Sequence, residues 1–261
     1  MEPTFQLFSS LRFDPQLTSS LANSSVSLDN EASPFYMLAY HRDRILEAAT
    51  CFGWTKVIDQ IQGSIGLKTL AQVLLQQEEI NRSKTALRVK VLVSHDGKIT
   101  AEVNPTPDVP LENLYPSKIS APSTSASPGQ GTGRAWDILP DTSRTAPSPY
   151  TRNKTTRREM YDAARERIGI QSMTEKREVL IISDQGDIME GSLTSVFFWR
   201  NGRWATPPIS SGGQAGTTRR WLLEEGLCVE EAVGVDSLRE GEECWISNGV
   251  RGMSWGKVKL S

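Results

Sequence analysis

A stretch dense in proline, serine and glycine, from Asn104 to about Arg134, constrains the fold of this 261-residue chain more than any other feature. It contains NPTPDVP and SAPSTSASPGQGTGR, which have too few apolar side chains to bury a core of their own. We therefore predict a linker or long exposed loop over residues 109–134. A small N-terminal α/β domain over residues 1–108 and a larger C-terminal domain over residues 135–261 are expected on either side.

The N-terminal part mixes strands and helices. Phe5 to Phe13 alternates as a strand does, and Thr18 to Ser33 is a polar segment typical of a surface loop. Helical spacing of apolar residues predicts one helix after Tyr40 and another over Leu67 to Ile80. Two apolar runs on either side of His95-Asp96-Gly97 predict a β-hairpin.

The C-terminal part mixes the same elements. Its expected helices are Thr155 to Ile168 and Gly216 to Glu225, the second stopped by Gly226. Its expected strands include Glu178 to Ser183 and Thr194 to Trp199. Two such parts define the fold class as α+β, and a cleft between two domains is the usual place for a ligand.

Composition excludes several functional classes. Twenty-nine basic against 31 acidic residues leave a net charge of −2, so there is no global attraction for nucleic acid. No apolar run is long enough to span a membrane, and the N-terminus does not read as a secretory signal, so we expect a cytoplasmic protein. Three widely spaced cysteines and two histidines favour neither a disulfide framework nor a metal site.

The segment from Thr206 to Gly226 has the features of an anion site. Pro207-Pro208 ends a strand, glycines follow, and a helix is expected to begin at Gly216-Thr217-Thr218. The unsatisfied N–H groups and partial positive charge of a helix N-terminus suit a phosphate. The spacing matches neither GxxxxGK[ST] nor GxGxxG, which argues against a nucleotide phosphate.

Three further pieces carry chemical groups. Glu190 precedes small and hydroxyl residues and an apolar strand, Lys154 lies among arginines before a helix, and His41 and Arg44 form an H-x-x-R pattern. Taken alone, each of these three segments is also compatible with a solvent-exposed surface segment that has no function. A desolvated lysine among positive charges would have a lowered pKa and would attack a carbonyl well.

In this order, H-x-x-R, the lysine, E-G-x-x-x-S and T-P-P…G-x-T-R resemble the class IV aminotransferase family, the fold type IV pyridoxal-phosphate enzymes. The opening FQLFSSLRF and the segment Ser247 to Gly252 are similar to the aminodeoxychorismate lyase branch. The resemblance implies pyridoxal 5′-phosphate as cofactor, a small-molecule amine substrate and a homodimer. It also implies that residues 135–261 are the cofactor-binding domain.

The resemblance also implies residue roles. Lys154 would bond to the cofactor aldehyde and then shuttle protons, Glu190 would pair with the pyridine nitrogen, and Arg44 would bind the phosphate. The helix start Gly216, Thr217 and Thr218 would hold the same phosphate. Candidate substrate contacts are Ser9, Ser10, Arg12, Lys98 and Asn248.

The branch implies elimination of pyruvate from 4-amino-4-deoxychorismate to give 4-aminobenzoate. The alternative is a transaminase for branched-chain amino acids, D-amino acids or (R)-amines, and a non-catalytic relative is a third reading. Two positions depart from the family. Gly249 replaces a hydroxyl residue, and the loop His95 to Lys98 replaces one that often binds a substrate carboxylate.

Overall fold

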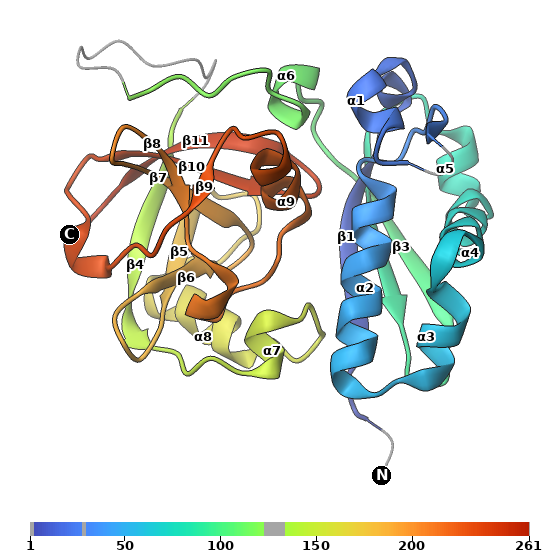
Figure 1. Cartoon of the computed structure of the whole chain (residues 1–261), viewed down its shortest axis with the longest axis horizontal. Helices are drawn as coiled ribbons and strands as arrows, with labels where there is room; N and C mark the ends of the chain where they lie inside the picture. Colours follow the sequence, from blue (N-terminus) through green and yellow to red (C-terminus); the bar gives the residue numbers. More distant parts are fainter. Residues whose placement is uncertain (1–2, 28–29, 123–133, 261) are drawn as a thin grey trace. The chain divides into compact units, whose positions relative to one another are not determined.

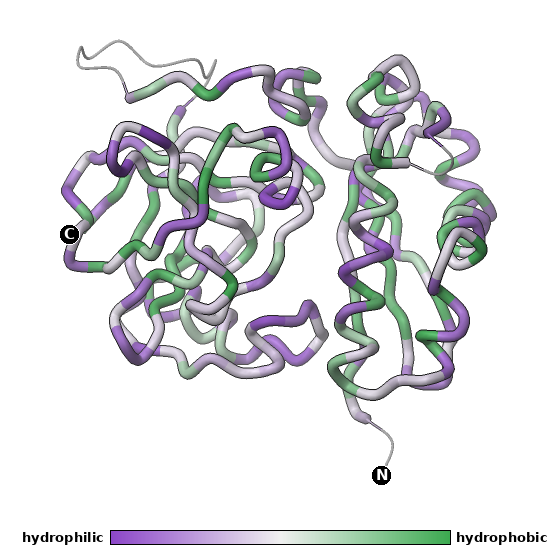
Figure 2. Tube along the Cα trace, in the orientation of Figure 1, coloured by the Kyte–Doolittle hydropathy of each residue, from purple (hydrophilic) through white to green (hydrophobic). Residues whose placement is uncertain are grey.

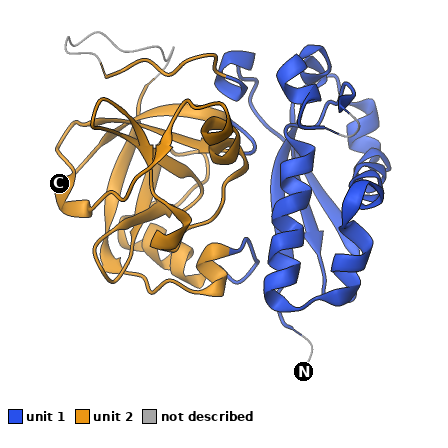
Figure 3. Ribbon diagram, in the orientation of Figure 1, with its two compact units in different colours: residues 1–115, 153–157, 249–251 blue, residues 116–152, 158–248, 252–261 orange. Residues whose placement is uncertain are grey.

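The computed structural model describes residues 3–27, 30–122 and 134–260 (Figure 1). The chain forms two compact units (Figure 3). Unit 1 comprises residues 1–115, 153–157 and 249–251, and unit 2 comprises residues 116–152, 158–248 and 252–261. This division differs from the contiguous one expected from the sequence, because two short segments of the second half pack with the first.

Unit 1 contains a three-stranded antiparallel sheet in the order β1-β2-β3. Its strands are β1 (Leu7–Phe13), β2 (Leu87–Val93) and β3 (Ile99–Pro105). The predicted hairpin is confirmed: β2 and β3 pair across the Asp96-Gly97 turn, where Gly97 has φ +87°, a value that favours glycine.

Helices pack on this sheet around an apolar core that includes Leu7, Leu11, Ile45 and Val91. The longest helix, α2, presents buried residues at helical spacing, and its trace alternates between hydrophobic and hydrophilic colours (Figure 2). The helical elements of unit 1 are η1 (Pro15–Ser19), α1 (Leu21–Ser24), α2 (Leu38–Phe52), α3 (Thr55–Ile61), α4 (Gly63–Leu75), α5 (Glu78–Arg82) and α6 (Leu111–Leu114).

The polar segment expected to be a surface loop is partly folded. It contains α1, and the side chain of Asn23 is completely buried. That amide donates to the Ser33 carbonyl at 2.7 Å and accepts from the Met37 N–H and the Tyr115 hydroxyl. A residue of this polar segment is therefore buried, because residues that are distant in the sequence satisfy the hydrogen bonds of its amide.

The expected linker also begins inside unit 1. Helix α6 buries Leu114 completely, and the Leu114 carbonyl accepts from the Tyr36 hydroxyl at 2.7 Å. Residues 116–122 form no helix or strand, but the Ser120 carbonyl accepts from the Trp204 indole in unit 2. Residues 123–133 of the predicted linker lie outside the described residues.

Unit 2 is built on an eight-stranded sheet in the order β6-β5-β4-β11-β10-β7-β8-β9. The sheet curls, because the Ile188 N–H at one edge donates to the Val233 carbonyl just beyond the other edge strand, at 2.8 Å. The strands are β4 (Trp136–Arg144), β5 (Arg177–Ile182), β6 (Ile188–Gly191), β7 (Ser195–Arg200), β8 (Arg203–Thr206), β9 (Val229–Glu230), β10 (Glu243–Asn248) and β11 (Gly252–Val258).

The helical elements of unit 2 are α7 (Pro149–Arg152), α8 (Glu159–Arg167), η3 (Ile209–Ser211), α9 (Thr217–Glu224) and η4 (Val235–Ser237). Helix α8 begins later than the sequence predicts, because Thr155 and Thr156 bond to the backbone at the start of β1 instead. Helix α9 ends as predicted, with Gly226 at φ +68°. Strands and helices in both units confirm the α+β class. No helix of residues 3–27, 30–122 or 134–260 is long and apolar enough to cross a membrane.

Candidate active site

In unit 1, strand β1 and helix α2 bring Ser9, His41 and Arg44 together. His41 and Arg44 lie one turn apart on α2 and therefore share a face. An Arg44 guanidinium N–H donates to Ser9 Oγ at 2.5 Å, and Ser9 Oγ lies 2.7 Å from His41 Nδ1. The same guanidinium nitrogen lies 3.4 Å from His41 Nδ1, and because a guanidinium can only donate, this contact favours the tautomer in which Nδ1 accepts and the Ser9 hydroxyl donates to it. His41 is thus an acceptor at Nδ1 and carries its proton on Nε2.

The electrostatics of unit 1 agree with this arrangement. His41 is completely buried, and burial lowers its pKa well below the usual range, with Arg44 and then Lys154 lowering it further. The imidazole is therefore neutral near pH 7. An Arg44 guanidinium nitrogen lies 3.4 Å from His41 Nδ1.

Lys154 lies in the short segment 153–157, which packs against β1. The Phe8 N–H donates to the Lys154 carbonyl at 3.0 Å, and the Lys154 Nζ lies 5.0 Å from the centre of the Phe8 ring. The Thr156 N–H also donates to the Gln6 carbonyl, so the main chain from the Lys154 carbonyl to Thr156 is held along the start of the strand. The amine therefore projects from a rigid support rather than from a free loop.

The His41 ring accounts for the presence of a glycine at position 249. A Cβ at position 249 would lie 2.5 Å from His41 Cε1 and 2.9 Å from the Ser10 carbonyl oxygen. The His41 ring therefore occupies the space that a side chain at position 249 would need.

In unit 2, Glu190 lies on β6 and is 7% exposed. Its Oε1 accepts a hydrogen bond from the Tyr161 hydroxyl at 2.5 Å. Burial, followed by the charge of Glu190, raises the pKa of Tyr161 well above its usual value, so the phenol stays protonated. A buried carboxylate with a neutral donor is able to pair with a protonated ring nitrogen.

The predicted anion site at the start of α9 is also in unit 2. Thr217 and Thr218 are buried, and the Thr218 hydroxyl donates to the Asn248 carbonyl at 3.1 Å. Gly216 precedes them and lies so close to the Ser195 hydroxyl that a Cβ there would collide with it. The glycine therefore lets the helix start approach the sheet.

A buried hydroxyl beside this helix start tests whether the site suits a phosphate. Ser247 pairs with Ser195 in the β10–β7 ladder, so both side chains lie on the sheet face that carries Gly216. Ser247 is 2% exposed, and its Oγ has no hydrogen-bond partner among the residues that the structure describes. A buried hydroxyl without a partner, on the sheet face that the start of α9 approaches, fits an anion.

Within unit 1, the candidate substrate contacts Ser9 and Ser10 lie on different faces of the sheet. Because side chains alternate across β1, Ser9 faces α2 whereas Ser10 points to the other face, 3.4 Å from an Arg88 nitrogen. Lys98 is exposed on the β2–β3 hairpin, and Asn248 is half-buried at the end of β10. Ser9 is therefore part of the Arg44 support in this structure, and a pair of adjacent hydroxyls does not form.

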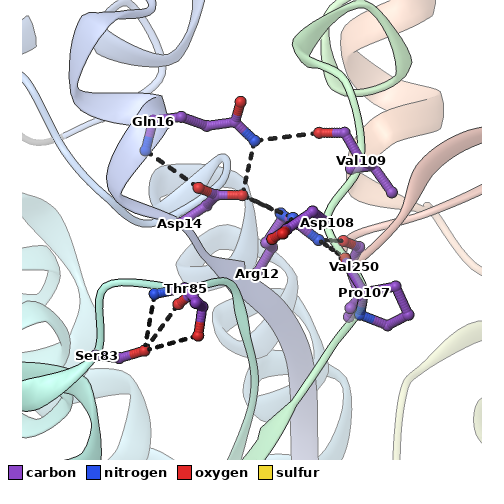
Figure 4. A network of polar contacts seen from close by, with 9 residues as sticks. All are labelled: Arg12, Asp14, Gln16, Ser83, Thr85, Pro107, Asp108, Val109 and Val250. Atoms are coloured by element: carbon purple, nitrogen blue, oxygen red, sulfur yellow. Dashed lines mark hydrogen bonds and ion pairs between the residues drawn. The ribbon is translucent and has the colours of Figure 1, made fainter.

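The Arg12 side chain forms an ion pair and hydrogen bonds within unit 1 (Figure 4). Its side chain is completely buried, and its Nε and Nη2 both lie 2.7 Å from Asp14 Oδ2. Its Nη1 donates to the Pro107 carbonyl at 2.9 Å and to the Val250 carbonyl at 3.4 Å. The guanidinium ties β1 to two distant segments, so we do not propose it as the cation for a substrate carboxylate.

Comparison with known proteins identifies the family. The profile described as amino-transferase class IV matches residues 27–255. The chain belongs to the class IV aminotransferase family. It is 31% identical over 204 residues to aminodeoxychorismate lyase of Saccharomyces cerevisiae, across 70% of this chain and 54% of that protein. A Schizosaccharomyces pombe relative is 36% identical over 112 residues and is matched over 48% of its length. The chain thus spans about half the length of the curated relatives it matches.

Solved structures of class IV aminotransferases share the fold. The branched-chain amino acid aminotransferase of Escherichia coli superposes with a TM-score of 0.60 at 16% identity, over 97% of this chain and 76% of that one. The pyridoxal-phosphate-bound form of a hypothetical aminotransferase from Mycobacterium tuberculosis gives 0.62 at 16% identity, over 97% and 81%. Enzymes of this fold bind pyridoxal 5′-phosphate, and this class IV chain is an enzyme of that kind.

Sequence reasoning missed three groups of this class IV enzyme: Tyr161, Gln214 and Ser247. Each touches or adjoins a residue that the motifs did identify. Gln214 and Ser247 lie within segments that the sequence singled out, but none of the three was assigned a role. A helical register would have placed Tyr161 on the buried face of α8, although not beside Glu190. For Gln214 and Ser247 the sequence carries no signal, because their neighbours come from other elements.

Proposed function

We propose that this class IV enzyme is an aminodeoxychorismate lyase, which eliminates pyruvate from 4-amino-4-deoxychorismate and releases 4-aminobenzoate. The observation that carries the proposal is the 31% identity to the Saccharomyces cerevisiae lyase over 70% of the chain. The family resemblance assigns the cofactor and proton-transfer roles of this reaction to Lys154, Glu190, Arg44, Thr217 and Thr218.

Each proposed cofactor contact has a matching feature in its own unit. Lys154, on its backbone-anchored segment, would bond covalently to the cofactor aldehyde. Glu190 would pair with the ring nitrogen, and the phosphate would be held by Arg44, Gly216, Thr217 and Thr218. When bound, the cofactor supplies a ring that accepts the electron pair left by a removed proton.

The proposed proton movements belong to Lys154. After the substrate amine displaces it from the cofactor, the free amine would take the proton from the ring carbon that carries the amino group. The electron pair would break the bond between the ring carbon and the enolpyruvyl oxygen, and the ring would become aromatic. The proton that Lys154 has taken would be returned to the departing enolpyruvate, which becomes pyruvate. Glu190 would keep the cofactor nitrogen protonated throughout, and the Ser9–His41 pair would hold Arg44 on the phosphate.

The substrate also carries carboxylates that need partners. With Arg12 bonded to Asp14, the exposed Lys98 is the candidate cation among the predicted contacts, with Ser10 and Asn248 as polar candidates. Replacement of Lys98 by Ala should raise KM more than it lowers kcat if the lysine binds the substrate. The resemblance also carries the proposals of a homodimer, tested by light scattering, and of a cytoplasmic location.

One assay separates the two enzyme readings. Purified enzyme reconstituted with pyridoxal phosphate is given 4-amino-4-deoxychorismate, and pyruvate and 4-aminobenzoate are quantified together. The lyase yields them in equal amounts and leaves the cofactor as the aldehyde. Accumulation of pyridoxamine phosphate with branched-chain amino acids, D-amino acids or (R)-amines, without 4-aminobenzoate, would instead establish a transaminase. A Lys154→Ala protein should lose activity by several orders of magnitude. If this variant still formed pyruvate and 4-aminobenzoate at the native rate, Lys154 would have no catalytic role.

A further inference from the structure

Tyr161 is the centre of a buried polar network in unit 2. Its hydroxyl lies 2.5 Å from Glu190 Oε1 and 3.0 Å from the Thr151 carbonyl oxygen, and it accepts a hydrogen bond from Gln214 Nε2 at 3.0 Å. Tyr161 is 1% exposed, and Gln214 and Glu190 are 8% and 7% exposed. Water therefore has little access to the carboxylate on this side.

The direction of the Tyr161 hydrogen bond can be worked out by counting protons. The hydroxyl has one proton and two possible acceptors, Glu190 and the Thr151 carbonyl. The carboxylate is nearer, and an ionised acceptor forms the stronger bond. The Gln214 amide occupies a lone pair of the same oxygen as a donor, which leaves the proton for Glu190. Tyr161 thus donates to one oxygen of the carboxylate.

The fold builds this network with two close backbone approaches. A Cβ on Gly213 would lie 2.5 Å from the Met189 carbonyl oxygen and 3.3 Å from Glu190 Cβ. A Cβ on Gly212 would lie 2.7 Å from Pro147 Cβ. Only glycines let the loop press against β6, and that contact brings the next residue, Gln214, onto the tyrosine hydroxyl.

A cation holds the tyrosine ring from its face. The Arg158 guanidinium lies 4.9 Å from the Tyr161 ring centre, and its own Nη2 donates to the Ser192 carbonyl at 3.0 Å. The ring is therefore fixed by α8, the loop before α9 and the turn after β6 together. An aromatic side chain held in this way keeps its hydroxyl on one oxygen of Glu190.

We propose that Tyr161 and Gln214 are positioning residues for Glu190, which hold its carboxylate in the orientation that meets the cofactor's protonated ring nitrogen. This rests on the proposed role of Glu190. A carboxylate that is already fixed by a hydrogen bond loses less conformational freedom when it binds a pyridinium N–H, so the binding is tighter. The network thereby sets how strongly the apoprotein distinguishes the pyridine ring from a ring without nitrogen.

The test compares two ligands on the full-length apoprotein: pyridoxal phosphate, and its deaza analogue in which the ring nitrogen is CH. Dissociation constants are measured by quenching of tryptophan fluorescence for the native protein and for Tyr161→Phe. The variant should bind pyridoxal phosphate about 10- to 100-fold more weakly, as expected for loss of a hydrogen bond to a charged group, and the analogue within about 2-fold of native. Equal weakening of both ligands, or of neither, overturns the proposal.

Three further variants separate the possible failures. Glu190→Gln should abolish the preference for pyridoxal phosphate; if the preference survives, Glu190 does not meet the nitrogen and the proposed function loses that contact. Gln214→Met should give a smaller loss in the same direction, which keeps the proposal testable if Tyr161→Phe folds poorly. Tyr115→Phe is the matched control, because it removes a hydrogen-bonded hydroxyl in unit 1 and should leave both affinities unchanged.

Discussion

Replacement of Gly249 by alanine provides the sharpest test of the packing around His41. Gly249 does not have a positive φ, so alanine causes no backbone strain there. The new Cβ would instead lie 2.5 Å from His41 Cε1, 2.8 Å from His41 Nε2 and 2.9 Å from the Ser10 carbonyl oxygen. Ordinary contacts of this kind are about 3.5–4.0 Å, so atoms must move by roughly 1 Å.

The loss of stability in Gly249→Ala depends on which atoms have to move. His41 is completely buried and bonded to Ser9, so neither the ring nor the strand can yield cheaply. Overpacking of this kind costs about 1–3 kcal/mol in free energy of unfolding. In a protein of this size that corresponds to a fall of about 2–12 °C in Tm. Gly249→Ser should cost at least as much, so restoring the family's hydroxyl should not improve the enzyme.

The assay is urea unfolding followed by tryptophan fluorescence, with Gly234→Ala as the matched control. Gly234 has an ordinary φ of −72°, and a Cβ there would meet nothing within 4 Å. The control should change the free energy of unfolding by less than about 0.5 kcal/mol. In a His41→Ala background the ring is gone and only the approach to the Ser10 carbonyl oxygen at 2.9 Å remains, so adding Gly249→Ala should then cost less than it does in the native protein.

Two results would refute this reasoning. One is a Gly249→Ala protein as stable as the native one, which would mean that His41 does not occupy the space beside position 249. The other is an equal cost of Gly249→Ala with and without the imidazole, which would place the clash on the backbone alone.

Three other predictions concern stability and reactivity. Folding holds the pKa of His41 below its unfolded value of about 6.5, so the unfolded chain binds more protons below that pH, and the free energy of unfolding should fall by up to about 1.4 kcal/mol per pH unit between pH 6.5 and 5. His41→Gln should remove this part of the slope in urea titrations, and substitution of the exposed His95 should leave it. Arg12→Ala should cost about 3–5 kcal/mol in the same assay, because it leaves the Asp14 carboxylate buried without its cation; a loss below about 1 kcal/mol would contradict the network. Burial raises the pKa of Cys228 to about 12, and of the three thiols only Cys51 is exposed. Folded protein at pH 8 should therefore show one fast thiol with a disulfide reagent, absent from Cys51→Ser, and a second fast thiol would count against the buried placement.

Part of the site follows from local sequence alone. The H-x-x-R spacing puts His41 and Arg44 on one face of α2 as soon as a helix forms, because residues three apart are neighbours on its surface. The Asp96-Gly97 turn likewise determines the β2–β3 hairpin, and Gly226 determines where α9 stops. These are short-range preferences of the backbone and do not depend on the rest of the fold.

The expected division at a Pro/Ser/Gly-rich linker shows where such reasoning stops. Composition marks residues 109–134 as unable to form a core, yet Leu114 is buried because unit 1 supplies a pocket and a hydroxyl from Tyr36. In the same way Thr155 was expected in a helix but bridges to Leu7 in the structure. Burial and hydrogen bonding to distant segments override local propensity in both places.

The sequence by itself determined the family, the cofactor class and the order of the charged and hydroxyl residues along the chain, since these depend on motifs that fold locally. Only the tertiary structure decided that Ser9 joins Arg44 to His41, that His41 fills the space beside Gly249, and that Tyr161 donates to Glu190. The partners in each case come from different elements, 29 to 208 positions apart (190 − 161 = 29; 249 − 41 = 208). Spacing within an element sets which side chains share a face, but the packing of elements sets what that face meets.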